Sequence, residues 1–252
     1  MPEFRSRKAL VNPELRRRGI YILPNLLTTA ALFAGFYAIV QAMTGRFEQA
    51  AVAIFIAMIM DGLDGRVARL TRTQSAFGAE YDSLSDMVSF GVAPALVMFE
   101  WAMKGMGKWG WIAAFIYCVG AALRLARFNT NIEVVDKRFF QGLPSPAAAA
   151  LVAGFVWVMI DLNYKGEELR WQAWALTLFA GVTMVSNFRY YSGKDINLRR
   201  SVPFIAVLAI VLFFVLVSSY PPGVLFALFL CYAFSGYVMA AWGWIRRRNS
   251  PA

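Results

Sequence analysis

A run of uncharged and mostly apolar residues, VPFIAVLAIVLFFVLVSS, occupies positions 202–219. A helix needs about 20 such residues to cross the hydrocarbon core of a bilayer. The run lacks the alternation of polar and apolar residues that a strand of a membrane β-barrel would have. Because only helices and closed barrels satisfy their own backbone hydrogen bonds in lipid, this stretch predicts a membrane-spanning helix.

Similar apolar runs fill most of the chain, and glycines, prolines or short polar segments separate them. We expect helices near 25–43, 47–71, 79–103, 109–128, 144–162, 171–187, 202–219 and 222–245. The predicted fold class is therefore an all-α integral membrane protein, a bundle of about eight transmembrane helices. The expected organisation is a basic juxtamembrane segment (1–22), a single transmembrane catalytic domain (23–245) and a basic tail (246–252).

The composition excludes several classes of protein. Of the 252 residues, 59% are hydrophobic and 16% are charged, against about 45–50% and about 25% in soluble domains. So many apolar runs leave only short loops, which rules out a separate soluble domain, a disordered chain and a secreted disulfide scaffold. The chain has no histidine, which excludes imidazole metal sites and Ser-His-Asp or Cys-His catalysis.

The net charge of +10 follows from membrane topology and does not indicate nucleic-acid binding. With eight spans and a cytoplasmic N-terminus, most of the 25 Lys and Arg residues lie on the cytoplasmic side, as the positive-inside rule predicts. The opposite side receives only Arg46, Lys104, Lys108, Lys165 and Arg170. Both termini are therefore expected to be cytoplasmic. Residues 5–20 predict a short basic amphipathic helix at the membrane surface.

Acidic residues occur where a membrane helix should have none, in Asp61-x2-Asp64-Gly65-x2-Ala68-Arg69 and Gly78-x3-Asp82-x3-Asp86. Spacings of three and four residues place each group on one helix face. At 1.5 Å per residue, Asp61 and Asp86 lie at matching depth on antiparallel helices, and Asp64 matches Asp82. We therefore expect one cluster of carboxylates in the cytoplasmic third of the membrane.

Such a cluster has two explanations. Nearby arginines could neutralise it as a structural ion-pair network, but each intramembrane acid is costly, by about 2.5–3.5 kcal/mol on insertion scales. A pair of Mg²⁺ or Mn²⁺ ions would balance the charge and suits carboxylate oxygens, and two-metal sites commonly act on phosphoryl groups. Arg69 could then bind phosphate. Gly65 and Ala68 would leave room for a ligand or for close helix packing.

The complete pattern from Asp61 to Asp86 resembles the signature of the CDP-alcohol phosphotransferases. The resemblance implies a six-helix family core, to which the last two helices would be additions, and a homodimer. It implies that Asp61, Asp64, Asp82 and Asp86 hold two divalent cations, Mg²⁺ or Mn²⁺, and that Asp86 is the general base. It also implies a CDP-diacylglycerol site formed by Asn25, Thr28, Asp61, Asp64, Gly65, Ala68, Arg69 and Gly78.

Further segments are similar to the branch of the family that uses L-serine as acceptor. They are residues 82–94, 123–128, 142–147 and 185–190. Met87 follows Asp86, and Ala31 stands seven residues after Pro24, where branches with a phosphorylated acceptor tend to carry Lys and Arg. The implied reaction transfers the phosphatidyl group of CDP-diacylglycerol to the serine hydroxyl and releases CMP. It implies an integral protein of the cell membrane, the inner membrane in a bacterium, with a cytoplasmic active site.

The serine carboxylate needs a cation. Arg124 and Arg127, at the cytoplasmic end of one helix, are our candidates, and Arg189 is a weaker third. Arginines at that place would equally serve as topology anchors. Two other functions stay open: a sister transferase for glycerol phosphate, inositol phosphate or choline, and an ion-coupled carrier, which would also explain intramembrane acids. The inverted repeats and broken helices of carriers are not evident in the sequence.

Overall fold

The computed structural model describes residues 13–130, 139–192 and 204–248, and these residues are almost entirely helical. The first two helices are α1 (Pro13–Met43) and α2 (Phe47–Thr71). One continuous rod then comprises α3 (Ala76–Asp86), η1 (Met87–Val92), α4 (Ala93–Met98), η2 (Phe99–Met103) and η3 (Lys104–Met106). It is followed by α5 (Lys108–Thr130), α6 (Ser145–Asp161), η4 (Gly166–Leu169), α7 (Arg170–Val185), α8 (Phe204–Ser219) and α9 (Pro221–Arg248).

The helices lie where the hydropathy pattern predicts them, with ends shifted by a few residues, except that the helix predicted over 25–43 already begins at Pro13. Within the described residues, the segments long and apolar enough to cross a membrane are 23–43, 76–106, 108–130 and 221–242. The helices over 145–161 and 207–219 are apolar but shorter, and α2 carries charged residues in its last turns. An all-α membrane protein is therefore confirmed, whereas eight separate crossings remain a prediction.

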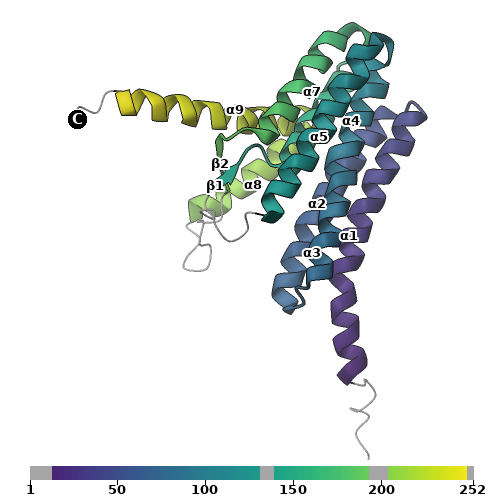
Figure 1. Cartoon of the computed structure of the whole chain (residues 1–252), viewed down its shortest axis with the longest axis vertical. Coiled ribbons are helices and arrows are strands. Elements are labelled where there is room, and N and C mark those ends of the chain that lie inside the picture. The colour runs from purple at the N-terminus through teal and green to yellow at the C-terminus, as the bar shows by residue number, and fades with distance from the viewer. Residues whose placement is uncertain (1–12, 131–138, 193–203, 249–252) are drawn as a thin grey trace, which may run out of the picture.

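The basic N-terminal helix expected over residues 5–20 is not seen as a separate element. Helix α1 begins at Pro13 and continues past Pro24 into the first apolar run. Residues 13–20 are therefore the first turns of this one long helix (Figure 1). Residues 1–12 of the predicted juxtamembrane segment and residues 249–252 of the predicted tail lie outside the described residues.

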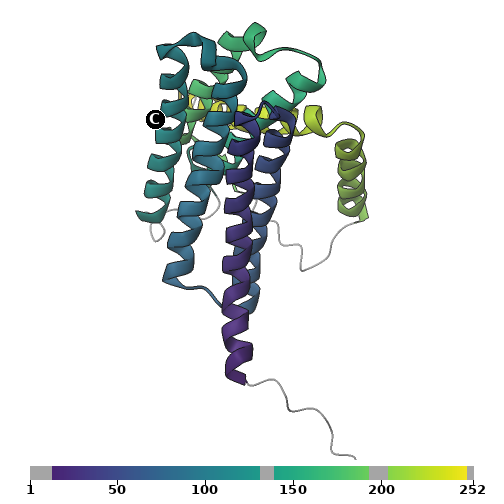
Figure 2. The ribbon, with the colours of Figure 1, turned by 90° about the vertical axis from the view of Figure 1, so that its right-hand side faces the viewer.

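The bundle core is built largely from alanine and glycine, which allow helix backbones to approach closely. Helices α1 and α2 pack along each other through buried alanines that include Ala38, Ala42, Ala50 and Ala57. Helices α5 and α7 meet at Gly120 and Gly181, where a Cβ on Gly120 would lie 2.5 Å from the Gly181 carbonyl oxygen. Figure 2 shows α1, α2 and the rod from α3 standing side by side.

The rod of residues 76–106 is not a uniform α-helix. Its η1 and η2 segments are π-helical, a local widening that often accompanies functional sites. On either side of the start of η1, Ser85 and Ser89 donate hydrogen bonds to the Thr28 and Ala31 carbonyl oxygens of α1, each at 3.1 Å. The rod is thereby fixed against α1 around Asp86.

A short antiparallel ladder interrupts the helical fold. Strand β1 (Phe139–Gln141) pairs with β2 (Arg189–Tyr191), with Phe140 opposite Tyr190. The ladder joins the segment before α6 to the segment after α7. Helix α9 runs across the bundle beside this ladder and not along the other helices, whereas α8 stands apart from them (Figures 1 and 2). Hydropathy predicted the existence of α9 but not this crossing angle.

Candidate active site

The two aspartates of α2 share one face of the helix, as their spacing predicts. Asp61 and Asp64 lie one turn apart, and Asp64 is only 4% exposed. Oγ1 of Thr28 on α1 donates a hydrogen bond of 2.6 Å to Oδ2 of Asp64. The same hydroxyl donates to the Pro24 carbonyl oxygen at 3.1 Å. The orientation of Asp64 is therefore fixed from the neighbouring helix.

Helix α3 brings the third carboxylate to this face. Its first turn is capped by Ser75, whose Oγ accepts a hydrogen bond of 3.0 Å from the Gly78 backbone N–H, as serine commonly does at this position. Asp82 follows one turn after Gly78. One carboxylate oxygen from each of Asp61, Asp64 and Asp82 lies within 4.8 Å of the others. The predicted clustering is thus confirmed for these three residues.

Asp86 is not among these three. It lies one turn further along the rod than Asp82, immediately before the π-helical segment, and interacts electrostatically with Asp61 and Asp82. Its depth next to Asp61 agrees with the pairing expected from the helix rise. Asp86 therefore adjoins the cluster without being equivalent to its three other members.

The three clustered carboxylates have the properties of a cation site. Oδ1 of Asp82 is buried and has no hydrogen-bond partner among the described residues, which is costly for a carboxylate unless a cation binds it. Among the side chains that the structure describes, the one ion pair joins Lys104 to Glu100, so none of the described Arg or Lys side chains pairs directly with the cluster. Hard divalent cations prefer such oxygen ligands. The residues fit a divalent ion better than an ion-pair network.

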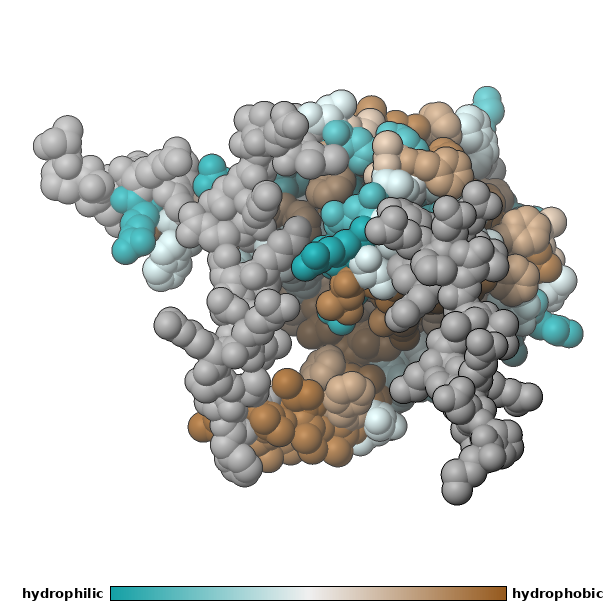
Figure 3. Space-filling view, turned by 90° about the horizontal axis from the view of Figure 1, so that it is seen from below, coloured by the Kyte–Doolittle hydropathy of each residue, from teal (hydrophilic) through white to brown (hydrophobic). Residues whose placement is uncertain are grey.

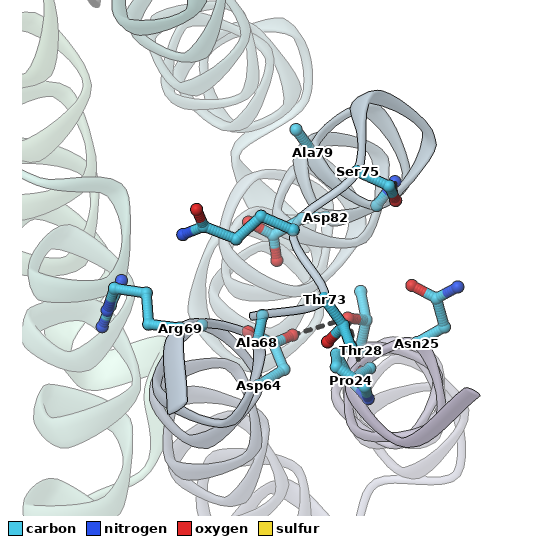
Figure 4. Close-up of a pocket in the computed structure, with 13 residues that line it drawn as sticks. Pro24, Asn25, Thr28, Asp64, Ala68, Arg69, Thr73, Ser75, Ala79 and Asp82 are labelled. Carbon is cyan, nitrogen blue, oxygen red and sulfur yellow. Dashed lines mark hydrogen bonds between the residues drawn. The ribbon is translucent and has the colours of Figure 1, made fainter. Parts of the chain in front are cut away.

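A cavity of about 240 Å³ opens beside the cluster, between α1, α2 and α3. Most of the residues proposed for CDP-diacylglycerol line it: Asn25, Thr28, Asp64, Gly65, Ala68, Arg69 and Gly78, together with Asp82. Asp61 is not part of its wall. Figure 4 shows Asp64 and Thr28 joined across the cavity floor, with Asp82 and Arg69 at its sides. The sequence did not single out the other lining residues, Pro24, Thr73, Gln74, Ser75 and Ala79.

Gly65 leaves space in this cavity. Apart from the backbone of its own helix, a Cβ on Gly65 would have one neighbour within 4 Å among the described residues. That neighbour is the Arg69 guanidinium, at 3.6 Å. No neighbouring helix approaches it, which separates the two explanations given for this residue. The space beside Gly65 is open, and no described helix packs closely against this residue.

The candidate acceptor arginines lie in the last two turns of α5. Nη1 of Arg124 donates a hydrogen bond to Oγ of Ser145, and the guanidinium interacts electrostatically with Asp86 and Asp61. Nη1 of Arg127 is 3.5 Å from the Ser186 carbonyl oxygen and 3.4 Å from Oδ1 of Asn187. Arg124 therefore adjoins the acidic cluster, and Arg127 rests on the segment after α7.

Arg189 is exposed on β2 opposite Gln141, and no contact with the cluster is recorded for it in the described part of the chain.

Viewed from the end where α3 begins, hydrophilic side chains gather near the centre of the face and hydrophobic ones on its flanks (Figure 3). A polar patch thus lies at this end of a largely apolar bundle.

Comparisons with known proteins agree with this geometry. The model of the CDP-alcohol phosphatidyltransferase family matches residues 21–185, which include the whole acidic cluster. A CDP-diacylglycerol–serine O-phosphatidyltransferase of Helicobacter pylori is 39% identical over 71% of this chain and 75% of its own length. A protein of the same name from Mycobacterium tuberculosis is 38% identical over 67% of this chain and 60% of its own length. Another, from Methanocaldococcus jannaschii, is 40% identical over 54% of this chain and 61% of its own length.

Proposed function

The chain belongs to the CDP-alcohol phosphatidyltransferase family, and we propose that it transfers the phosphatidyl group of CDP-diacylglycerol to L-serine. The products are phosphatidylserine and CMP. The names of the relatives support serine as the acceptor. The observation that carries the proposal is the cluster of Asp61, Asp64 and Asp82 beside a cavity lined by Gly65, Ala68, Arg69 and Gly78 of the same sequence pattern.

Asp61, Asp64, Asp82 and Asp86 would hold two divalent cations, Mg²⁺ or Mn²⁺. When bound, such cations stabilise negative charge on a pyrophosphate and its leaving group. Oδ1 of Asp82, which has no partner among the described residues, and one carboxylate oxygen each of Asp61 and Asp64 would supply ligands to a cation. The hydrogen bond from Thr28 keeps Asp64 in one orientation, as partners of ligating carboxylates commonly do.

The cavity would hold the CDP headgroup. Arg69 offers a planar donor for phosphate, and Asn25 and Thr28 offer polar groups from α1. Gly65, Ala68 and Gly78 keep the walls low enough for the headgroup to approach the carboxylates. The acyl chains would remain in the surrounding lipid.

Asp86 would act as the general base. Its carboxylate takes the proton of the serine hydroxyl as the oxygen attacks the phosphorus that carries the diacylglycerol. The new phosphorus–oxygen bond forms while the bond to CMP breaks, and CMP leaves with the electron pair. Asp86 lies beside the cluster and near Arg124, which supports this role. Because Arg124 is the candidate ligand of the serine carboxylate, the serine hydroxyl would approach the cluster beside Asp86.

Arg124 and Arg127 would bind the serine carboxylate, with Arg189 as a further donor. Arg124 is held by Ser145 beside Asp86, so it can orient the amino acid with its hydroxyl toward the base. We also propose a homodimer, cytoplasmic termini and a cytoplasmic active site, and in a bacterium the inner membrane. A single catalytic domain over residues 23–245 completes the proposal.

The decisive experiment offers the purified protein several acceptors. The protein in lipid nanodiscs receives CDP-diacylglycerol, Mg²⁺ or Mn²⁺, and serine, glycerol phosphate, inositol phosphate or choline. We expect CMP and a new phospholipid with serine and not with the other acceptors. Release of CMP only with another acceptor would contradict the serine assignment, and no divalent-dependent release with any acceptor would contradict the reaction.

A further inference from the structure

Four aromatic residues tie α9 to the segment between α7 and α8. We call them the aromatic clamp: Phe188 and Tyr190 from that segment, and Tyr232 and Tyr237 from α9. The ring centroids of Phe188 and Tyr237 are 4.4 Å apart, and those of Tyr190 and Tyr232 are 5.5 Å apart. All four lie beyond residues 21–185, which match the family model.

Tyr190 is the centre of the clamp. Its side chain is fully buried, and its hydroxyl donates a hydrogen bond of 2.8 Å to the Ala233 carbonyl oxygen of α9. Its ring lies directly on Gly236, where a Cβ would approach the ring to 2.4 Å. Burial raises the pKa of the Tyr190 hydroxyl, so the group stays protonated and keeps its role as donor. No side chain larger than hydrogen fits at residue 236 without displacing this ring.

The clamped segment also carries the contacts of Arg127. Asn187 accepts from Arg127, and its Oδ1 accepts a second hydrogen bond of 3.1 Å from Nε2 of Gln141. The Gly142 backbone N–H donates to the Phe188 carbonyl oxygen at 2.8 Å. The segment is therefore held by β1 and its flank on one side and by α9 on the other, with the Arg127 side chain resting on it.

A second link reaches Arg124. The Tyr232 hydroxyl donates a hydrogen bond of 3.2 Å to the Tyr191 carbonyl oxygen, and Tyr232 lies in the neighbourhood of Arg124. One face of α9 thus touches the surroundings of both candidate acceptor arginines. A shift of Tyr190 would move the support of Arg127 while leaving the cavity between α1, α2 and α3 untouched, because no residue of the clamp lines that cavity.

We propose that the aromatic clamp positions Arg124 and Arg127 for the acceptor, so that α9 helps to select serine without touching the phosphoryl-transfer site. Tyr190, Tyr232 and Gly236 are positioning residues in this scheme. The inference rests on the proposed reaction with serine. It predicts that damage to the clamp weakens the use of serine and spares the use of CDP-diacylglycerol.

The test is the variant Gly236→Ala, assayed by CMP release against serine concentration and, separately, against CDP-diacylglycerol mole fraction. We expect the KM for serine to rise roughly tenfold or more, because small misplacements of positioning groups are costly. The KM for CDP-diacylglycerol and the affinity for Mn²⁺ should stay unchanged. Tyr190→Phe keeps the ring and loses only the hydrogen bond to the Ala233 carbonyl oxygen, so its serine KM should rise several-fold, less than that of Gly236→Ala. Val238→Ala, at an exposed position of α9, is the matched control and should have no effect.

Tyr232→Phe removes only one hydroxyl and provides a second test if Gly236→Ala does not fold. We expect it to raise the serine KM several-fold. A serine KM unchanged in the folded variants would overturn the clamp while the proposed reaction stands. Equal changes in both KM values, together with a lower melting temperature, would show a purely structural role and also overturn it. Wild-type protein that releases no CMP with serine would contradict the proposed reaction and the clamp together.

Discussion

Oγ1 of Thr28 lies 2.6 Å from Oδ2 of Asp64 and donates a hydrogen bond to it from the neighbouring helix. Thr28→Val keeps the shape of the side chain and removes the donor. We expect Mn²⁺ affinity to fall roughly 10- to 100-fold, as it does when supporting partners of metal ligands are lost. Mn²⁺ titration followed by electron paramagnetic resonance measures this. Thr29→Val is the control, because the Thr29 hydroxyl contacts Tyr81 and the Asn25 carbonyl oxygen and no carboxylate. Equal affinity in both variants would contradict the role of Thr28.

Removal of divalent ions should destabilise the protein as well as inactivate it. The carboxylates of Asp61, Asp64 and Asp82 lie within 4.8 Å of one another, so they repel one another when no cation is bound. We expect chelation to lower the melting temperature, and Mn²⁺ at 100 times its Kd to restore about 2.7 kcal/mol of stability.

Asp82→Asn separates repulsion from metal binding. In chelated protein it should raise the melting temperature, because one negative charge is gone, and added Mn²⁺ should stabilise it less than the wild type. Asp161→Asn, at the far end of α6, should change neither value. If neither chelation nor Asp82→Asn changed the melting temperature, the cluster would not be a cation site.

Gly65→Ala tests the space in the cavity. The added methyl group meets only the Arg69 guanidinium, at 3.6 Å, so the melting temperature should stay within about 1–2 °C, as for an unstrained surface change of a few tenths of a kcal/mol. The KM for CDP-diacylglycerol should rise several-fold because the methyl group occupies the headgroup site. Gly62→Ala lies on the same helix with nothing within 4 Å and is the matched control. An unchanged KM in Gly65→Ala would mean that the headgroup does not enter this cavity.

Asp86→Asn tests the general base. Turnover should fall by a factor of about 10²–10⁴, the usual contribution of a positioned base, while binding of CDP-diacylglycerol persists. CMP release and equilibrium binding of radiolabelled CDP-diacylglycerol measure the two effects separately. Glu80→Gln makes the same charge change at an exposed position of α3 and should be active. Near-normal turnover in Asp86→Asn would remove Asp86 from this role.

Arg124→Lys and Arg127→Lys test the acceptor site. Lysine keeps the charge but cannot contact Ser145 and present two parallel donors to a carboxylate. Loss of a charged hydrogen bond costs about 1.5–3 kcal/mol, so we expect the serine KM to rise roughly 10- to 100-fold. Arg170→Lys, exposed at the opposite end of the bundle, is the control. If both variants kept the wild-type serine KM, the arginines would be topology anchors only.

Local spacing predicted the parts of this site that lie on single helices. Asp61 and Asp64 share a face because three residues make nearly one turn, and the helix rise predicted that Asp82 meets Asp64 and that Asp86 meets Asp61. These relations depend only on helix geometry and on antiparallel neighbours. They are confirmed in the structure, apart from the separate position of Asp86 beside the tighter group of three.

Contacts between distant segments could not be predicted in this way. Gln141 and Asn187 are 46 positions apart, and their hydrogen bond exists because β1 and β2 pair in a particular register. The π-helical segment after Asp86 lies against α1 and has no periodicity signal in the sequence. Hydropathy indicates which residues are removed from water but not the angle at which a helix crosses its neighbours. The segment 222–245 was therefore expected to run along the bundle like the other helices, whereas α9 runs across it.

The cavity of about 240 Å³ between α1, α2 and α3 has a kinetic consequence. In the proposed function its helices are embedded in lipid, so CDP-diacylglycerol would reach it by lateral diffusion and serine would reach the adjoining cluster from the aqueous phase. Occupancy by the lipid therefore follows its mole fraction in the membrane, and dilution with inert phospholipid slows the reaction at constant bulk concentration. Occupancy by serine follows ordinary molarity. One site thus responds to a surface density and to a volume concentration at once, and membrane composition alone can change its rate.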